Sequence, residues 1–362
     1  MDNTLKRQPK EDHKPQAEQK PQEKQDPWIL YTLEDARKER PPREYIVDGI
    51  FRLPSLNIVY AAPGDLKTML MIDLCGCVAA GVDWLPPAPW QDGAAPIKTK
   101  KGAALWLDFD NGQDEMMDRI EAISNTLELA NDAPFYYYVM PDPWLNAADP
   151  LQIGQLIQRA QSLETKLIVI DNLGTISGGI DENSSQMIKP MSNLRRLAEE
   201  TGAAVVLIHH QRKGNGFKAG RAGDSLRGHS SIEAAINLAL HVEREPNSDT
   251  LNIKSTKTRG TDVYPFGAVF TYEHKPGTKD LAKFRFFGLQ GKDDSSAGAI
   301  EREILAVLKD GMLNQSHLID AVKNNGLEVG KDRILDMLNR LEVNNKIAST
   351  RGAHNAKVYT LR

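Results

Sequence analysis

Residues 56–68 read LNIVYAAPGDLKT and run from Leu56 to Thr68, and this stretch decides the fold. Four of its first five residues are apolar, which predicts a buried strand, whereas residues 67–80 have the pattern of a helix. Pro63 and Gly64 between them indicate a turn. A strand, a short turn and a helix in this order are typical of a βα unit.

The turn also fits the pattern G-x-x-x-x-G-K-[ST], with Ala61 and Leu66 in the two glycine positions. In that pattern Lys67 would reach the β- and γ-phosphates of a nucleotide and Thr68 would hold Mg²⁺. Backbone N–H groups at the helix start would cradle the anion. The alternative is an ordinary strand–turn–helix corner. The residues predicted to contact nucleotide are Ala62, Pro63, Gly64, Asp65, Leu66, Lys67, Thr68 and Met69.

The chain downstream repeats this alternation of apolar runs and helical stretches. Residues 187–200 have helical spacing, and residues 236–272 contain a β-rich continuation. Continuous apolar strands separated by helices predict an α/β fold with a mostly parallel sheet covered on both faces. The further buried strands are expected within residues 103–109, 135–140, 167–170 and 203–208.

Residues 167–171 are four apolar residues followed by Asp171. An acid at the carboxyl end of a buried strand can reach a Mg²⁺ bound at a neighbouring phosphate loop. Any parallel sheet can end a strand in aspartate, so the interpretation depends on the phosphate-loop pattern. Together the two motifs predict ATP and Mg²⁺ as ligands, with Thr68 and Asp171 as the metal-binding residues.

Composition excludes several protein classes. The 362 residues are 40% hydrophobic and have a net charge of −4. This charge excludes a uniformly basic nucleic-acid-binding surface. The sequence shows no run that suits a membrane span or a secretory signal. The two cysteines, Cys75 and Cys77, cannot build a disulfide framework, so a cytoplasmic location is expected.

Four segments are expected along the chain. Residues 1–27 are rich in Lys, Glu, Gln and Pro and are expected to be a disordered polar tail. Residues 28–290 would form the main domain, and 291–298 a linker. Residues 299–362 show three amphipathic helical patterns and then a hairpin pattern, the order of a winged-helix domain. The alternative is a small helical cap that contacts proteins.

The motifs and their order resemble RecA-type ATPases, nearest to the plasmid RepA hexameric helicase group with its phage and mobile-element AAA-type relatives, and more distantly to DnaB-type helicases. The resemblance covers about residues 28–275. It implies a RecA-like P-loop NTPase core. It also implies an ATP-driven hexameric ring that acts on DNA.

The resemblance implies four catalytic roles beyond Lys67 and Asp171. Asp110 falls where the family has a glutamate that polarises the attacking water, although Asp108 is a substitute and Asp110 could instead cap a helix. His210 matches a residue that senses the γ-phosphate. Lys257 and Arg259 match a pair that reaches the γ-phosphate of a neighbouring subunit, and the alternative for them is a plain basic hairpin.

Residues 211–230 are glycine-rich and basic. A loop of this length inside a compact domain is usually functional or disordered. Five cations with few acids beside them would follow a nucleic-acid backbone, although a solvated surface loop is the alternative. The residues predicted to bind DNA are Arg212, Lys213, Lys218, Arg221 and Arg227.

These observations predict an ATP-hydrolysing, ring-forming DNA motor, a replicative-type helicase of a plasmid, phage or mobile element. Its partners would be single-stranded DNA at the basic loop, duplex DNA at the winged helix and further copies of itself, with no membrane. The alternatives are a nucleotide-dependent DNA-binding regulator that does not unwind, and an ATPase that acts on proteins. The sequence leaves translocation polarity, DNA sequence preference and ring size open.

Overall fold

The computed structural model describes residues 29–90, 96–211, 230–260, 263–289, 294–309, 311–325, 329–343, 346–352 and 356–362. The predicted polar tail lies outside these ranges. All five predicted DNA-binding residues also lie outside the described residues, namely Arg212, Lys213, Lys218, Arg221 and Arg227.

The chain divides into two units, Met1–Pro42 and Arg43–Arg362. In the first unit, Thr32 and Asp35 form a capping box at the start of helix α1 (Leu33–Arg37). The Thr32 backbone N–H donates to Asp35 Oδ2 over 2.9 Å, and the Asp35 N–H donates to Thr32 Oγ1 over 3.3 Å. The two bonds satisfy donors that a helix start otherwise leaves unpaired.

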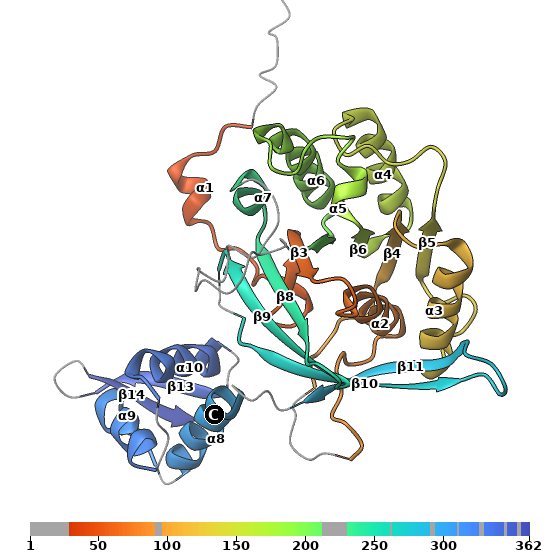
Figure 1. Ribbon diagram of the computed structural model, residues 1–362. Helices are drawn as coiled ribbons and strands as arrows, with labels where there is room; N and C mark the ends of the chain where they lie inside the picture. Colours follow the sequence, from red (N-terminus) through yellow and green to blue (C-terminus); the bar gives the residue numbers. More distant parts are fainter. Residues whose placement is uncertain are drawn as a thin grey trace, which may run out of the picture. The chain divides into compact units, whose positions relative to one another are not determined.

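The second unit contains a nine-stranded sheet with the order β11-β10-β9-β8-β3-β7-β6-β4-β5 (Figure 1). The six strands from β8 to β5 in this order pair in parallel, whereas β9, β10 and β11 extend the sheet with antiparallel pairs. The expectation of an α/β fold with a large, mostly parallel sheet is confirmed. The strands are β3 (Ser55–Ala61), β4 (Ala103–Asp108), β5 (Phe135–Val139), β6 (Thr165–Asp171), β7 (Ala204–His210), β8 (Leu238–Arg244), β9 (Thr250–Thr258), β10 (Phe266–His274) and β11 (Leu281–Leu289).

Helices cover both faces of this sheet, because its central strands are apolar on both sides. Along β3, Val59 belongs to the core beneath α2 and α3, whereas Ile58 and Tyr60 belong to the core beneath α4 and α6. A short antiparallel pair, β1 (Glu44–Val47) and β2 (Phe51–Leu53), precedes β3. The helices are α2 (Lys67–Ala80), α3 (Gln113–Thr126), α4 (Pro150–Ser162), α5 (Leu173–Ile176), the 3-10 helix η1 (Ser185–Met187), α6 (Ile188–Thr201) and α7 (Ser230–Ala235).

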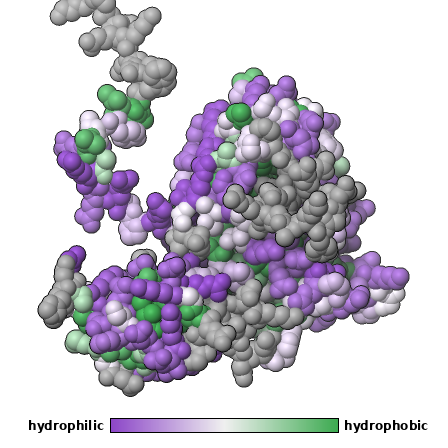
Figure 2. All heavy atoms as spheres, turned by 60° about the vertical axis from the view of Figure 1, so that its left-hand side comes forward, coloured by the Kyte–Doolittle hydropathy of each residue, from purple (hydrophilic) through white to green (hydrophobic). Residues whose placement is uncertain are grey.

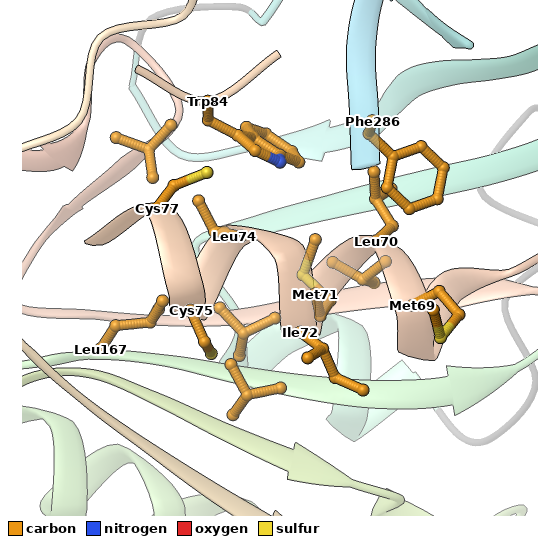
Figure 3. Close-up of a cluster of buried hydrophobic side chains, with 14 of the residues drawn as sticks. Met69, Leu70, Met71, Ile72, Leu74, Cys75, Cys77, Trp84, Leu167 and Phe286 are labelled. Carbon is orange, nitrogen blue, oxygen red and sulfur yellow. The ribbon is translucent and has the colours of Figure 1, made fainter. Parts of the chain in front are cut away.

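Helix α2 is buried nearly all round. Figure 3 shows Cys75 and Leu74 on different sides of this helix, with Trp84 and Phe286 close to it. A helix that is apolar on every side needs protein on every side. Gly81 ends α2 in the left-handed conformation with φ 77°, and a Cβ there would lie 2.8 Å from Lys101 Cβ.

A buried ion pair joins α2 to the antiparallel part of the sheet. Arg285 Nη1 on β11 lies 2.6 Å from both carboxylate oxygens of Asp73 and 3.1 Å from Cys77 Sγ. Arg285 Nη2 also donates to the Asp83 carbonyl over 3.1 Å. Burial raises the pKa of Asp73, and the Arg285 charge opposes this rise. The pair holds strand β11 against the helix that carries the phosphate loop.

The residues after the large sheet build a separate small core. Ile304, Leu318 and Leu338 from three helices pack with Ile347 and Tyr359. The three-stranded sheet has the order β12-β14-β13, so β12 adds a strand to the hairpin that the sequence pattern predicted. The elements are α8 (Asp294–Lys309), β12 (Leu313–Asn314), α9 (Gln315–Asn324), α10 (Lys331–Val343), β13 (Ile347–Arg351) and β14 (Lys357–Leu361).

Within the described residues, none of the helices has the length and apolar content that crossing a membrane requires. In the view of Figure 2, hydrophilic residues make up much of the coloured surface, and hydrophobic residues are interspersed among them.

We predict that Arg285→Met lowers the free energy of unfolding by about 3–5 kcal/mol, because Asp73 then keeps a buried charge without its partner. Chemical denaturation followed by circular dichroism measures this change. The control Lys283→Met, on the same strand, removes an exposed pair with Glu273 and should cost less than about 1 kcal/mol. Equal losses in the two variants would contradict the assigned role of the buried pair.

Candidate functional site

The turn between β3 and α2 has positive φ angles at Gly64 and Leu66, although both glycines of the phosphate-loop pattern are absent. Leu66 adopts the left-handed conformation, with φ 56° and ψ 21°, immediately before α2. A side chain makes this conformation uncommon, and glycine adopts it readily. The Leu66 side chain packs against the first core, which offsets the strain. Gly64 has φ 90°, a backbone conformation that glycine adopts readily.

The first turn of α2 leaves backbone donors available for an anion. No side chain caps the start of this helix, so its first N–H groups face the loop. Lys67, the first residue of α2, is only 8% exposed. A buried cation beside free N–H groups at a helix N-terminus suits a phosphate group.

The two predicted metal-binding residues lie in direct contact. Thr68 Oγ1 donates a hydrogen bond to Asp171 Oδ2 over 2.7 Å, although 103 positions separate the residues. The contact forms because α2 starts at the carboxyl edge of the sheet, and β6 ends at the same edge. A hydroxyl and a carboxylate are hard oxygen ligands that suit Mg²⁺.

Asp171 is 1% exposed and lies among other acids. Burial, together with the charges of Asp108 and Asp110 and against the Thr68 hydrogen bond, raises the pKa of its carboxyl group to about 7. In the described part of the chain no group of three or more His, Cys, Asp or Glu side chains could hold a metal. Mg²⁺ in nucleotide sites uses one or two protein ligands with phosphates and water, so this donor set fits it.

The two candidate residues for positioning water differ in their bonding. Asp108 Oδ1 accepts the backbone N–H groups of Asp110, over 3.0 Å, and Asn111, over 2.8 Å, so Asp108 holds the turn after β4. Asp110 is exposed, and Gly112 occupies the N-cap position of α3. The alternative role of Asp110 as that N-cap is therefore wrong, and its role in positioning water stays a prediction.

His210 ends β7 beside the phosphate loop. It pairs in register with Ala61 at the end of β3, and the Gln211 backbone N–H donates to the Ala61 carbonyl over 2.9 Å. His209 points to the opposite face, where its Nδ1 lies 3.9 Å from Glu182 Oε1. Gln211 is the first residue of the predicted basic loop and lies next to the phosphate loop, whereas residues 212–229 lie outside the described ranges.

Lys257 and Arg259 lie at the other edge of the sheet. Thr258 pairs with Leu238, which pairs with Asn57 near the start of β3. Four residues separate Asn57 from the end of β3, which is about 13 Å along a strand. The two cations are therefore not brought together with Lys67 of their own chain.

Each of these cations holds the end of a helix. Lys257 Nζ donates to the Glu233 carbonyl, and Arg259 Nη2 donates to the Ala234 carbonyl, both in the last turn of α7. Burial, together with the charge of Arg259, lowers the pKa of Lys257. Cations at a helix C-terminus are stabilised by its dipole.

Sequence reasoning missed His241, which lies next to the end of β7. Its Nε2 lies 3.3 Å from Gln211 Oε1, and its ring centroid lies 5.0 Å from that of Tyr60. Burial lowers the pKa of His241 and favours its neutral form. The sequence shows only that His241 lies in a largely apolar strand, whose first five residues are buried, and this pattern does not separate a core histidine from a functional one.

We predict that, without metal, the free energy of unfolding of the parent protein falls relative to that of Asp171→Asn as the pH rises from about 4 to 7. The folded pKa of Asp171 is raised to about 7, so the unfolded chain ionises first and the folded state loses stability across this interval. Denaturant midpoints of both proteins at pH 5 and pH 8 measure the difference. A pH-independent difference would refute a buried, protonated Asp171.

A family model described as an AAA domain matches residues 19–216, more than half of the 362 residues. A search of curated proteins found no match. The matched region includes the phosphate loop, Asp110, Asp171 and His210. The chain therefore belongs to the AAA domain family of P-loop ATPases.

Proposed function

We propose that this protein is an ATP-hydrolysing motor that assembles into a ring and acts on DNA. The observation that carries the proposal is the separation of two sets of residues. Lys67, Thr68 and Asp171 lie at the carboxyl edge of the sheet, whereas Lys257 and Arg259 lie at its amino edge. Neither set is a complete site for phosphoryl transfer.

The carboxyl edge supplies nucleotide binding. Lys67 and the N–H groups at the start of α2 would bind the β- and γ-phosphates, and Thr68 with Asp171 would hold Mg²⁺. Mg²⁺, when bound, neutralises charge on those phosphates. Asp110, which is exposed at the same edge, would orient the attacking water.

The amino edge would complete the site of a second copy. A cation that enters from outside stabilises charge on the transferring phosphoryl group, and a neighbouring subunit can supply it. Lys257 and Arg259 would exchange their contacts with α7 for a neighbour's γ-phosphate. Because each copy then needs the next, the contact between copies is head-to-tail, and the resemblance to RepA-type helicases suggests that it closes into a hexameric ring.

Two features support DNA as the substrate. The five predicted DNA-binding cations follow His210 in the sequence, which would let a change at the γ-phosphate be passed along the chain to DNA. The C-terminal order of three helices and a hairpin supports a winged-helix domain, with Lys331 and Arg333 exposed at the start of α10. Arg340 on the same helix instead lies over the Tyr264 ring, 4.0 Å from its centroid.

The second candidate is a DNA-binding regulator that uses the same pocket as a switch. The engagement of Lys257 and Arg259 with α7 favours it, because a resting subunit would hold its catalytic cations away from any nucleotide. An assignment to plasmid, phage or mobile-element replication depends on the resemblance alone.

We predict that Lys67→Ala abolishes ATP hydrolysis, because it removes the buried cation of the phosphate loop, and that single-stranded DNA stimulates the parent protein. Phosphate release measures both. The control Lys98→Ala removes an exposed lysine paired with Asp83 and should leave hydrolysis unchanged. Full activity of Lys67→Ala would overturn the nucleotide site. Stimulation without displacement of a strand from a forked duplex would favour the regulator.

We predict that Arg259→Ala lowers the rate of hydrolysis by about 10³-fold or more while ATP still binds. ATP still binds because Arg259 lies outside the nucleotide site of its own chain. Mixing this variant with Lys67→Ala subunits should restore activity, since each variant supplies what the other lacks. Unchanged hydrolysis in Arg259→Ala would exclude a role across the interface.

A further inference from the structure

A small cavity lies at the amino edge of the sheet, away from the phosphate loop. Its volume is about 30 Å³, and three arginines from separate segments line it. Arg43 precedes β1, Arg52 lies on β2, and Arg259 follows β9. Arg43 Nη1 is 3.7 Å from the position of a Cβ on Gly260, so its guanidinium lies over the turn that carries Arg259.

The charge of this cavity is not balanced within the described residues. Its lining includes no aspartate or glutamate, and within the described ranges none of the three arginines forms an ion pair with a carboxylate. Arginine stays charged at any physiological pH, so the three guanidinium groups repel one another. An anion between them would remove this repulsion.

One charged donor of the cavity lacks a partner in the part of the chain that the structure describes. Arg52 Nε is buried there without a hydrogen-bond partner, which is costly for a charged group. Asn237 also lines the cavity, and its Oδ1 accepts the Leu56 backbone N–H over 3.0 Å. That bond fixes the side chain, whose NH₂ group is a further donor at the cavity. The cavity thus combines charged donors with an oriented neutral one.

The size and charge of the cavity select one kind of anion. The space holds about one or two water-sized atoms, so it admits the tip of a tetrahedral oxyanion and excludes a base or a sugar. A phosphodiester has one charge and substituents on two oxygens, whereas a terminal phosphate has three unsubstituted oxygens and a charge near −2. Guanidinium groups bind such oxygens in pairs.

We propose that Arg43, Arg52 and Arg259 together bind a terminal phosphate group. Two sources have this chemistry, namely free inorganic phosphate and the γ-phosphate of a nucleotide on a second copy. The second source rests on the proposed function, because it needs two copies in contact. In that case Arg43 and Arg52 act with Arg259 on the neighbour's nucleotide, in addition to Lys257.

The first experiment uses inorganic phosphate as the probe and measures binding by isothermal titration calorimetry. The Lys67→Ala full-length protein serves as background, because it removes the phosphate loop as a competing site. Arg43→Gln and Arg52→Gln should each weaken binding about tenfold or more, through the loss of charge-assisted hydrogen bonds. The control Arg196→Gln changes an exposed arginine on α6 and should bind as the background does. Circular dichroism verifies that each variant is folded.

The second experiment measures ATP hydrolysis in variants with an intact Lys67. If the ligand is a neighbour's γ-phosphate, Arg43→Gln and Arg52→Gln lower kcat about tenfold or more with little change in KM. Adding Lys67→Ala subunits then restores kcat, which a merely structural defect would not allow. Normal kcat together with weakened phosphate binding would overturn the nucleotide source and leave free phosphate as the ligand.

Two results would overturn the phosphate site if kcat is also normal. One is unchanged phosphate binding in both arginine variants, and the other is no phosphate binding in the Lys67→Ala background. The proposed ATPase would survive that result, because hydrolysis by the parent and its loss in Lys67→Ala are independent of this cavity. If instead the parent hydrolyses no ATP while phosphate binding depends on Arg52, the proposed function fails and the anion site stands.

Discussion

The burial of helix α2 is the constraint on which the rest of the ATPase core depends. The helix is enclosed by the sheet and α3, and its Asp73 forms a buried ion pair with Arg285 of β11. Because it cannot rotate or slide without exposing apolar surface, its first residue has one possible position. Lys67 and Thr68 are therefore presented at the carboxyl edge of the sheet. The strained backbone at Leu66 is maintained by the same packing.

The parallel arrangement of the central strands then separates two kinds of chemistry. The carboxyl ends of β3, β4, β6 and β7 gather at one edge, where Asp171, Asp110 and His210 follow buried strands. The antiparallel turn into β9 returns the chain to the opposite edge and places Arg259 there, next to Arg43 and Arg52. A rigid sheet keeps these edges apart, so one copy cannot combine them. Assembly is the physical way to bring them together, and this links the proposed ring to the proposed phosphate site.

Much of the core could be predicted from the sequence, because its signals are local. The helix predicted at residues 67–80 is α2, and Asp171 does end a buried strand. Local sequence patterns predicted less where two residues were candidates for the same role. The N-cap alternative for Asp110 was wrong, because Gly112 occupies that position. Asp108 was the substitute candidate in the sequence, and its hydrogen bonds to the turn after β4 distinguish it from Asp110.

The sequence by itself determined the alternation of strands and helices, the phosphate-loop pattern and the acid after β6, since periodicity and neighbouring residues carry this information. Only the tertiary structure decided which distant residues meet. The Thr68–Asp171 bond spans 103 positions, and the Asp73–Arg285 pair spans 212. The grouping of Arg43 and Arg52 with Arg259 likewise has no local signal. Such contacts depend on the order and direction of strands in the sheet, which local hydrophobic patterns do not encode.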